Sequence, residues 1–235
     1  MNLSATPAGA HQRRQLGNWR VGWLAGFFAL ASVHADPPSF GIFRRDFRPD
    51  NVFVYPAKLS LDLRRVAVLP LAAGPGEADL ADGCVALTPV LLEQMIKTRK
   101  FEVVSIDPSD LVRATGRRAW TGTETLPTDF LDFLRHEYGC DGVLFAELTL
   151  YHAYAPLAIG WRLKLVDTRS GQILWAVDEL FDAAEPAVRR SAQHFEGKGF
   201  GWPFSHDDNW LALNSPRQFG RYSAACLLTT LPDRQ

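Results

Sequence analysis

The sequence predicts an α/β fold of the mixed α+β kind, in which helices pack on one mixed sheet. An apolar, β-branched run at 65–71 is followed by a helical pattern and then by a second apolar run at 101–106, which is the order of a βαβ unit with parallel strands. Three strand-like segments joined by short polar turns span 140–181 and predict a three-stranded antiparallel meander. With 47% hydrophobic and 22% charged residues, the chain has enough apolar material for one sizeable core.

Residues 1–35 predict a signal peptide. Three arginines precede an uncharged apolar run at 21–33, namely Arg13, Arg14 and Arg20. The run is shorter than the roughly 20 apolar residues of a membrane-spanning helix, and it ends in the small-x-small pattern that signal peptidase cleaves. We therefore expect cleavage after Ala35, with an uncleaved membrane anchor as the alternative. Cleavage leaves 22 basic and 26 acidic residues, a balance that does not favour nucleic acid as a partner.

Residues 36–60 predict an extended aromatic arm. Four prolines in this stretch disfavour regular structure. The stretch also carries aromatic side chains that a disordered linker does not need, namely Phe40, Phe43, Phe47, Phe53 and Tyr55. We expect the arm to lie on a protein surface, either that of its own domain or that of a neighbouring subunit.

Residues 61–235 predict a single α/β domain. The expected elements between the first strand and the meander are a helix at 83–100, a strand at 101–106, a short helix at 107–115 and a helix at 128–138. Asp107 is placed to cap the short helix, and Pro108 stands at its first position, where proline is favoured.

The middle strand of the meander has one apolar and one polar face. Its apolar positions are Ile159, Trp161, Leu163 and Leu165, and the basic residues between them are Arg162 and Lys164. This alternation is typical of a sheet with one face buried and one exposed. The turn from Asp167 to Gly171 is polar with glycine near its end, as in the longer hairpins. After the meander we expect a helix at 183–195, a loop at 197–214 and a last helix that begins at Ser215 and Pro216.

The sequence predicts no catalytic residue, cofactor or metal. The Gly74-Pro75-Gly76 loop follows a strand and precedes a helix, but it lacks the lysine of a phosphate loop and is followed by acidic residues, so a plain turn is favoured. His206, Asp207 and Asp208 could ligate a metal ion, although a solvated loop is the simpler reading. A dispersed site, for example His206 and Asp207 with His152, keeps open the alternative of a small exported hydrolase or ligand-binding enzyme.

The three cysteines predict buried free thiols. Cys84, Cys140 and Cys226 lie in apolar surroundings on a helix, at a strand start and on a helix. Their odd number and irregular spacing do not form a disulfide framework. An exported chain could still oxidise two of them, and that alternative stays open.

The loop at 197–214 is a candidate interaction surface. Its aromatic residues lie in a glycine-rich stretch and are Phe200, Trp202, Phe204 and Trp210. Tryptophan joins apolar area to a polar group and is favoured at interfaces. The loop predicts a subunit contact or a contact with a membrane surface, and the alternative is that these side chains fold back over the helices.

Three motifs together resemble a known family. They are the RVAVLPL strand at 65–71, the FEVVS strand at 101–105, and the GCDGVLFAEL strand at 139–148, which leads into a WRLKLVD…G.ILW hairpin at 161–175. This set, over about residues 64–195, resembles the periplasmic domain of the curli-secretion channel lipoproteins. It is also similar to the penicillin-binding-protein activator lipoproteins, the Pel exopolysaccharide outer-membrane ring lipoprotein and the amino-terminal domain of the Tol translocation protein.

The resemblance implies a non-enzymatic protein that is either periplasmic or peripheral to the outer membrane. Such a protein would serve secretion or envelope assembly by forming a homo-oligomer or by docking a protein partner. A monovalent regulator of a peptidoglycan-synthesis enzyme is a further alternative. The chain departs from the curli channels in two ways: the link at Tyr154-Ala155-Pro156 is too short for a membrane-spanning hairpin, and no cysteine for a lipid anchor ends the apolar run.

Overall fold

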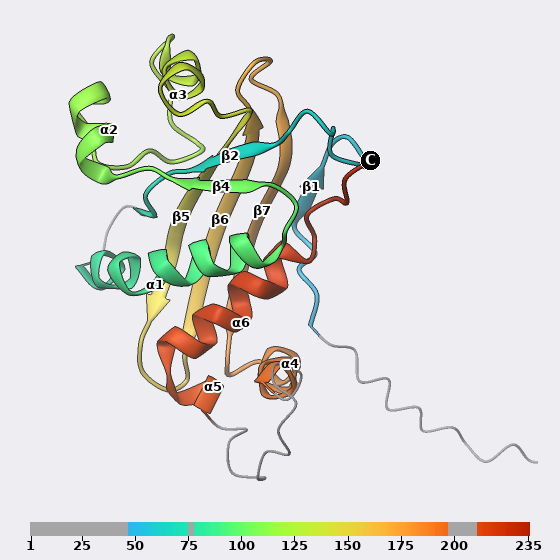
Figure 1. Cartoon of the computed structure of the whole chain (residues 1–235). Helices are drawn as coiled ribbons and strands as arrows, with labels where there is room; N and C mark the ends of the chain where they lie inside the picture. The colour runs from blue at the N-terminus through green and yellow to red at the C-terminus, as the bar shows by residue number, and fades with distance from the viewer. Residues whose placement is uncertain (1–46, 75–77, 197–210) are drawn as a thin grey trace, which may run out of the picture. The chain divides into compact units, whose positions relative to one another are not determined.

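A seven-stranded mixed sheet is the centre of the fold (Figure 1). The computed structural model describes residues 47–74, 78–196 and 211–235. Its strands are β1 (Val52–Val54), β2 (Arg65–Val68), β3 (Ala72–Ala73), β4 (Glu102–Ser105), β5 (Gly142–His152), β6 (Ala158–Asp167) and β7 (Ile173–Asp182). Its helices are α1 (Ala78–Lys97), α2 (Pro108–Thr115), α3 (Phe130–Tyr138), α4 (Pro186–Glu196), α5 (Leu211–Asn214) and α6 (Pro216–Leu228). The strand order is β1-β7-β6-β5-β2-β4, with β3 paired to β5.

The predicted βαβ unit is confirmed. Strand β2 runs parallel to β4, and α1 makes the crossover between them. The predicted helix start at 83 is wrong, because α1 begins at Ala78 and contains Gly83. A Cβ on Gly83 would lie 2.6 Å from the side chains of Leu148 and Tyr151 on β5. The glycine therefore permits close packing of helix on sheet and does not mark a helix boundary.

The antiparallel meander β5-β6-β7 is also confirmed. The four apolar side chains predicted on one face of β6 are all fully buried, and Arg162 and Lys164 on the opposite face are partly exposed. In the turn after β6, Gly171 adopts a left-handed φ of 70°. The Asp167 carboxylate accepts hydrogen bonds from the backbone N–H groups of Arg169 and Ser170 at 2.9 and 2.7 Å, and these bonds fix the turn.

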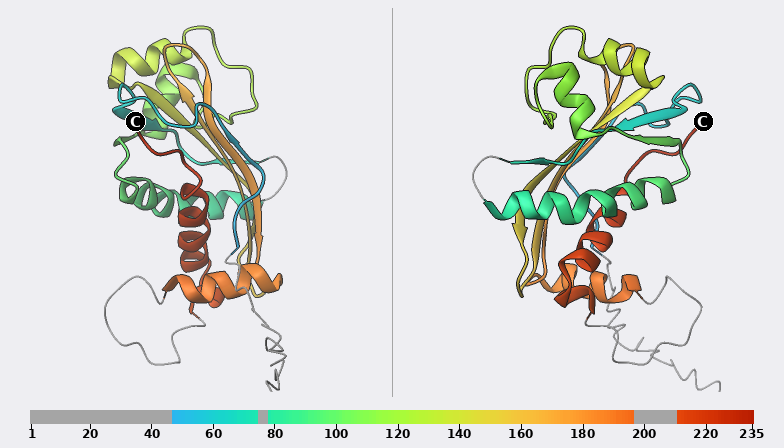
Figure 2. Two further views of the ribbon diagram at one scale, coloured as in Figure 1. Left: turned by 90° about the vertical axis from the view of Figure 1, so that its right-hand side faces the viewer. Right: turned by 60° about the vertical axis from the view of Figure 1, so that its left-hand side comes forward.

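Two apolar clusters lie on opposite faces of the sheet. The larger joins α1, α4 and α6 to the inner side of the meander, with Leu144, Ala146 and Leu148 as its contribution from β5. The smaller joins α2 and α3 to the other face, where β5 contributes Val143 and Phe145. Figure 2 shows α1 and α6 crossing one side of the sheet, with α2 and α3 gathered at one end. Two layers of helix therefore cover the sheet unequally.

The described part of the arm, residues 47–60, lies on its own domain. Strand β1 pairs antiparallel with β7, so this part of the arm is not without regular structure as the prolines suggested. The Phe47 ring packs edge-on against Phe181, with 5.1 Å between ring centroids. Leu59 pairs with Arg234 near the C-terminus. Residues 36–46, with Phe40 and Phe43, lie outside the described residues.

Other boundaries differ from prediction for local reasons. The first strand is broken after Val68, because Pro70 cannot donate to a ladder, and pairing resumes in β3. The helix predicted at 128 begins at Phe130, and the loop predicted at 197–214 ends in α5. The caps on α2 and α6 are confirmed, since Asp107 accepts from the Ser109 N–H at 2.7 Å and Ser215 accepts from the Gln218 N–H at 3.4 Å.

Among the described helices, not one combines the length and apolar character needed to span a membrane.

Replacing Ser223 with alanine should destabilise the fold. The Trp161 indole N–H donates to Ser223 Oγ at 2.8 Å, and both residues are fully buried. Ser223→Ala leaves that donor without a partner, so we expect a loss of about 2 kcal/mol in the free energy of unfolding. Urea denaturation of the residue 36–235 chain measures it. Thr229→Ala, at an exposed position on the same segment, is the control and should lose less than about 0.5 kcal/mol. Equal losses in the two variants would contradict the role of the buried bond.

Candidate functional site

The candidate site lies where two crossovers leave the sheet in opposite directions. Strand β2 lies between β4 and β5 and is parallel to both. The connection from β2 to β4 passes over one face through α1, and the connection from β4 to β5 passes over the other face through α2 and α3. The carboxyl ends of β2 and β4 meet at this divergence, since Val68 is in register with Ser105. Such a switch point is where open α/β sheets form ligand crevices.

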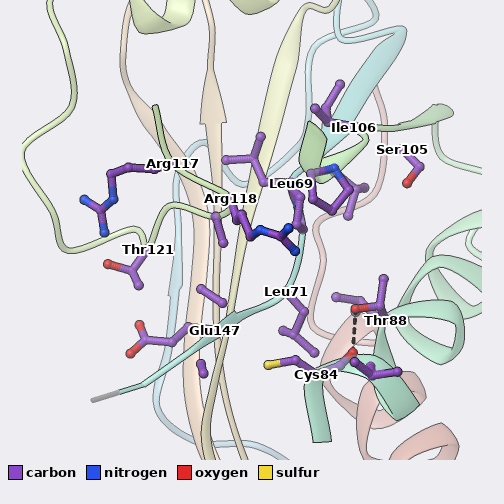
Figure 3. Close-up of a pocket in the computed structure, with 18 of the residues that line it drawn as sticks. Leu69, Leu71, Cys84, Thr88, Ser105, Ile106, Arg117, Arg118, Thr121 and Glu147 are labelled. Carbon is purple, nitrogen blue, oxygen red and sulfur yellow. Dashed lines mark hydrogen bonds between the residues drawn. The ribbon is translucent and has the colours of Figure 1, made fainter. Parts of the chain in front are cut away.

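A pocket of about 910 Å³ occupies this divergence (Figure 3). Its apolar floor is formed by Leu69 and Leu71 from the β2–β3 segment. One wall is a stripe of α1 at helical spacing, namely Ala81, Cys84, Val85, Thr88, Leu91 and Leu92. The opposite wall is the loop after α2, residues 117–124 except Trp120 and Gly122, and Glu147 closes one end. The volume lies in the range of about 300–1,000 Å³ that is typical of small-molecule pockets.

The loop wall is held by a network around Arg117. The Arg117 guanidinium donates to Glu124 Oε1 at 2.6 Å and lies 4.3 Å from the centre of the Trp120 ring. The Thr121 N–H donates to Glu124 Oε2 at 2.9 Å. Hydrogen bonds from the Thr121 N–H, which has the largest effect, and from Arg117 stabilise the charged form of Glu124. They lower the pKa of the Glu124 carboxyl below its ordinary value. Lys164 Nζ also donates to the Gly122 carbonyl, which ties the loop to β6.

Arg118 differs from the other charged residues that line the pocket. Asp107 caps α2, Glu124 is paired with Arg117, and Glu147 is paired with Arg162. Within residues 47–74, 78–196 and 211–235, Arg118 makes no hydrogen bond or ion pair. In Figure 3 its side chain extends toward the middle of the pocket, whereas Arg117 extends outward on the far side. The pocket thus offers one unpaired guanidinium above an apolar floor.

A row of three charges crosses the exposed end of the same sheet face. Glu147 on β5, Arg162 on β6 and Asp178 on β7 are directly opposite one another in register. Arg162 donates to Glu147 Oε2 at 3.2 Å and to Asp178 Oδ2 at 2.8 Å. The Glu147 side chain is only 4% exposed, whereas that of Asp178 is 43% exposed. Arg162 therefore neutralises a buried carboxylate, which would be costly if left unpaired.

The Cys84 thiol in the pocket wall is not set up as a nucleophile. Burial raises its pKa to about 11, so the thiol is protonated at neutral pH. Reactive cysteines show the opposite shift. Burial likewise raises the pKa of the Cys140 thiol to about 11. As predicted, Cys84, Cys140 and Cys226 are all free thiols. Only Cys140 is fully buried, so the prediction of burial is wrong for the half-buried Cys84 and Cys226.

Three of the residues predicted as an interaction surface are described by the structure. Phe53 and Tyr55 lie at the β1 edge and are more than half exposed, whereas Phe47 packs against the larger apolar cluster. The remaining candidates lie outside the described residues and are Phe40, Phe43, Phe200, Trp202, Phe204 and Trp210.

Of the dispersed catalytic site considered from the sequence, the structure describes His152. This residue does not line the pocket, and its Nδ1 lies 2.9 Å from the Pro156 carbonyl oxygen. His206, Asp207 and Asp208 lie outside the described residues. In the described part of the chain, no three side chains of the metal-binding types gather into a cluster.

Sequence reasoning missed the pocket, which depends on strand order. Two signals were nevertheless present. Pro70 interrupts the first apolar run at the point where the strand leaves its partner, and Arg117-Arg118 places two cations in a polar loop. Neither signal indicates that α1 and the 117–124 loop lie on opposite sides of β3.

Comparison with known proteins gives structural neighbours only. No protein-family model and no curated protein matches the chain. The solved structures similar to it include a PelC dodecamer from Paraburkholderia phytofirmans, at 12% identity and a TM-score of 0.43, covering 80% of this chain and 96% of that one. Lipoprotein GNA1162 from Neisseria meningitidis matches at 17% identity and a TM-score of 0.36, covering 57% of this chain and 94% of that one.

The LpoB C-terminal domain from Escherichia coli matches at 14% identity and a TM-score of 0.32, covering 50% of this chain and 82% of that one. PelC and LpoB are of the kinds that the sequence motifs resemble. Similarity this distant concerns the arrangement of the chain, and neither activity nor assembly state follows from it.

Removing Arg162 should destabilise the protein more than removing its exposed partner. Arg162→Gln leaves the buried Glu147 carboxylate unpaired, and we expect a loss of about 3 kcal/mol in the free energy of unfolding. Asp178→Asn breaks only an exposed pair and should cost less than about 1 kcal/mol. The double variant Glu147→Gln/Arg162→Gln should recover much of the loss. Chemical denaturation measures all three, and a double variant as unstable as Arg162→Gln would contradict the assignment.

The native thiols should react slowly with maleimide at pH 8. With a pKa of about 11, only about one Cys84 side chain in a thousand is ionised at that pH. We expect modification on the order of a hundredfold slower than in guanidinium, with a rate that rises steeply toward pH 11. Mass spectrometry of the labelled Cys84 peptide measures the rate. Fast labelling of native Cys84 at neutral pH would show a lowered pKa and would restore it as a candidate nucleophile.

Proposed function

We propose that the protein is a non-enzymatic accessory protein of a secretion or envelope-assembly system, acting in the periplasm or at the outer membrane. It works by docking a protein partner or further copies of itself. The leader pattern of residues 1–35 supports export, and the motifs over residues 64–195 support membership of the envelope proteins that they resemble.

The observation that carries the docking role is the apolar edge of the sheet at β1. Strand β1 ends the strand order, and among the described strands only β7 pairs with it. Phe53, Val54 and Tyr55 are 52%, 40% and 53% exposed along this edge. An outer strand with unpaired backbone groups and large apolar side chains is a template for another chain. Charged side chains are one of the ways in which edges without a docking role are protected, and these three consecutive residues carry no charge.

Two alternative functions differ from the proposed one in the site or the stoichiometry that they require. The pocket at the switch point favours ligand binding as a second function, but the protonated Cys84 gives no support to a hydrolase that uses this thiol. A monovalent regulator of a peptidoglycan-synthesis enzyme would use the same β1 edge, with one partner molecule for each copy. Stoichiometry separates that regulator from a self-assembling protein.

Photocrosslinking from the β1 edge tests the proposal. A benzophenone amino acid at position 53, in the full chain expressed in its host, should give one discrete crosslinked product in the envelope fraction. The control position is Tyr154, which is 80% exposed but lies between β5 and β6, away from β1. A benzophenone there should not give that product. Phe53→Glu should abolish partner capture from a neighbouring benzophenone at Tyr55.

The native mass of the residue 36–235 chain then assigns the product. Masses that are multiples of the chain indicate self-assembly, and a one-to-one complex with a second protein indicates the monovalent regulator. A monomer at high micromolar concentration that also gives no crosslinked product from position 53 would overturn the docking role.

A further inference from the structure

We propose that the pocket between α1, β3 and the 117–124 loop binds an extended peptide segment that carries one apolar side chain and one carboxylate. The inference rests on the proposed docking function, since it names a second surface through which a protein partner is held. It concerns a different part of the molecule from the β1 edge, so each can fail without the other.

The pocket contains an open strand edge. The last ladder bond between β2 and β4 is donated by the Ile106 N–H to the Val68 carbonyl at 3.1 Å. Beyond it the chain after β4 turns into α2, while Leu69 to Ala73 continues beside β5. Among the described strands, β3 therefore has a partner on one side only. A peptide laid along its other side would occupy the position that β4 has vacated, which is the geometry of β-strand addition.

The walls of the pocket select an apolar side chain. Val85 is 79% exposed although it is a large aliphatic residue in the middle of α1, and it faces the same pocket as the buried Leu71. Neighbouring wall positions Ala81 and Leu92 continue the stripe along the helix. A side chain inserted between this stripe and the Leu69–Leu71 floor would remove apolar area of both from water.

Arg118 selects a carboxylate. Among the charged residues that line the pocket, Arg118 is the one that forms no ion pair with a described residue. Its planar guanidinium can bind a carboxylate through two hydrogen bonds. The stripe on α1 and the loop that carries Arg118 are opposite walls of the pocket, and adjacent residues of an extended peptide point to opposite sides. A ligand with an apolar residue at position i and an acidic residue at position i+1 therefore presents the first to α1 and the second to Arg118 while its backbone follows β3.

A defined probe tests this assignment. The ¹⁵N-labelled residue 36–235 chain is titrated with acetyl-Thr-Leu-Asp-Thr-Thr-amide, and amide chemical shifts are followed by NMR. We expect millimolar binding, with the largest shifts at Ala72, Ala73, Val85 and Thr121. The matched Asn peptide should bind about tenfold more weakly, because it lacks the charge-assisted bond to Arg118.

Two variant pairs separate the pocket from general effects. Arg118→Gln should weaken the Asp peptide about tenfold and leave the Asn peptide unchanged, whereas Arg189→Gln on the exposed face of α4 should change neither. Val85→Glu should abolish binding, because it places a charge against the apolar side chain of the peptide. Ile96→Glu is the control on the same helix, because Ile96 is 60% exposed but does not line the pocket.

Three results would overturn the inference. The first is an absence of shifts at the pocket with saturating peptide. The second is equal loss of binding in Arg118→Gln and Arg189→Gln. The third is binding of decanoate, but not of the peptides, at the pocket residues, which would assign the pocket to a small anionic amphiphile. The Phe53→Glu variant should bind the peptide normally, so a failure of the β1 edge to dock a partner is distinguished from a failure of the pocket.

Discussion

The burial of β5 on both faces is the constraint on which the rest of the structure depends. From Gly142 to Leu148 every residue of this strand is buried, and alternate side chains enter different apolar clusters. The same strand pairs in parallel with β2 and β3 on one edge and antiparallel with β6 on the other. It therefore joins the βαβ unit to the meander and one helical layer to the other. Loss of its packing would separate all four parts at once.

The chemistry of the sheet changes where the second helical layer ends. On the face covered by α2 and α3, β5 presents Val143 and Phe145, and the next residue on that face is Glu147. A carboxylate is tolerated there because Arg162 lies directly opposite it on β6. The transition from apolar core to charged row coincides with the end of the pocket, which Glu147 closes. The pocket and the charged row are thus two consequences of a helical layer that covers only part of the sheet.

Local sequence patterns were sufficient for the meander and for the N-terminal caps of α2 and α6. The alternation of β6 depends only on neighbouring residues, and so do the Asp107 and Ser215 caps. Gly83 was misread because its reason lies on β5, far away in the sequence, and no local pattern carries that information. The membership of β1 in the sheet was missed for the same cause, since its pairing with β7 joins segments more than a hundred residues apart.

The candidate site was harder to predict than the fold. Arg117 and Arg118 are adjacent in sequence and identical in type, yet Glu124 and Trp120 engage the first and leave the second unpaired among the described residues. That difference is decided by the path of one loop. Likewise, the pocket exists because successive crossovers take opposite faces of the sheet, which requires the strand order. A sequence read in isolation contains neither fact.

The contacts between the two ends of the described chain constrain when folding can finish. Leu59 pairs with Arg234, whose guanidinium donates to the carbonyls of Lys100 and Leu61 at 2.9 and 2.8 Å. Lys100 Nζ in turn donates to the Leu231 and Pro232 carbonyls at 2.8 and 2.9 Å. These bonds join positions more than a hundred residues apart in the sequence, so they cannot form until residues 231–234 have been synthesised. A chain that crosses a membrane unfolded would gain time from this delay, and removing residues 231–234 would remove these contacts.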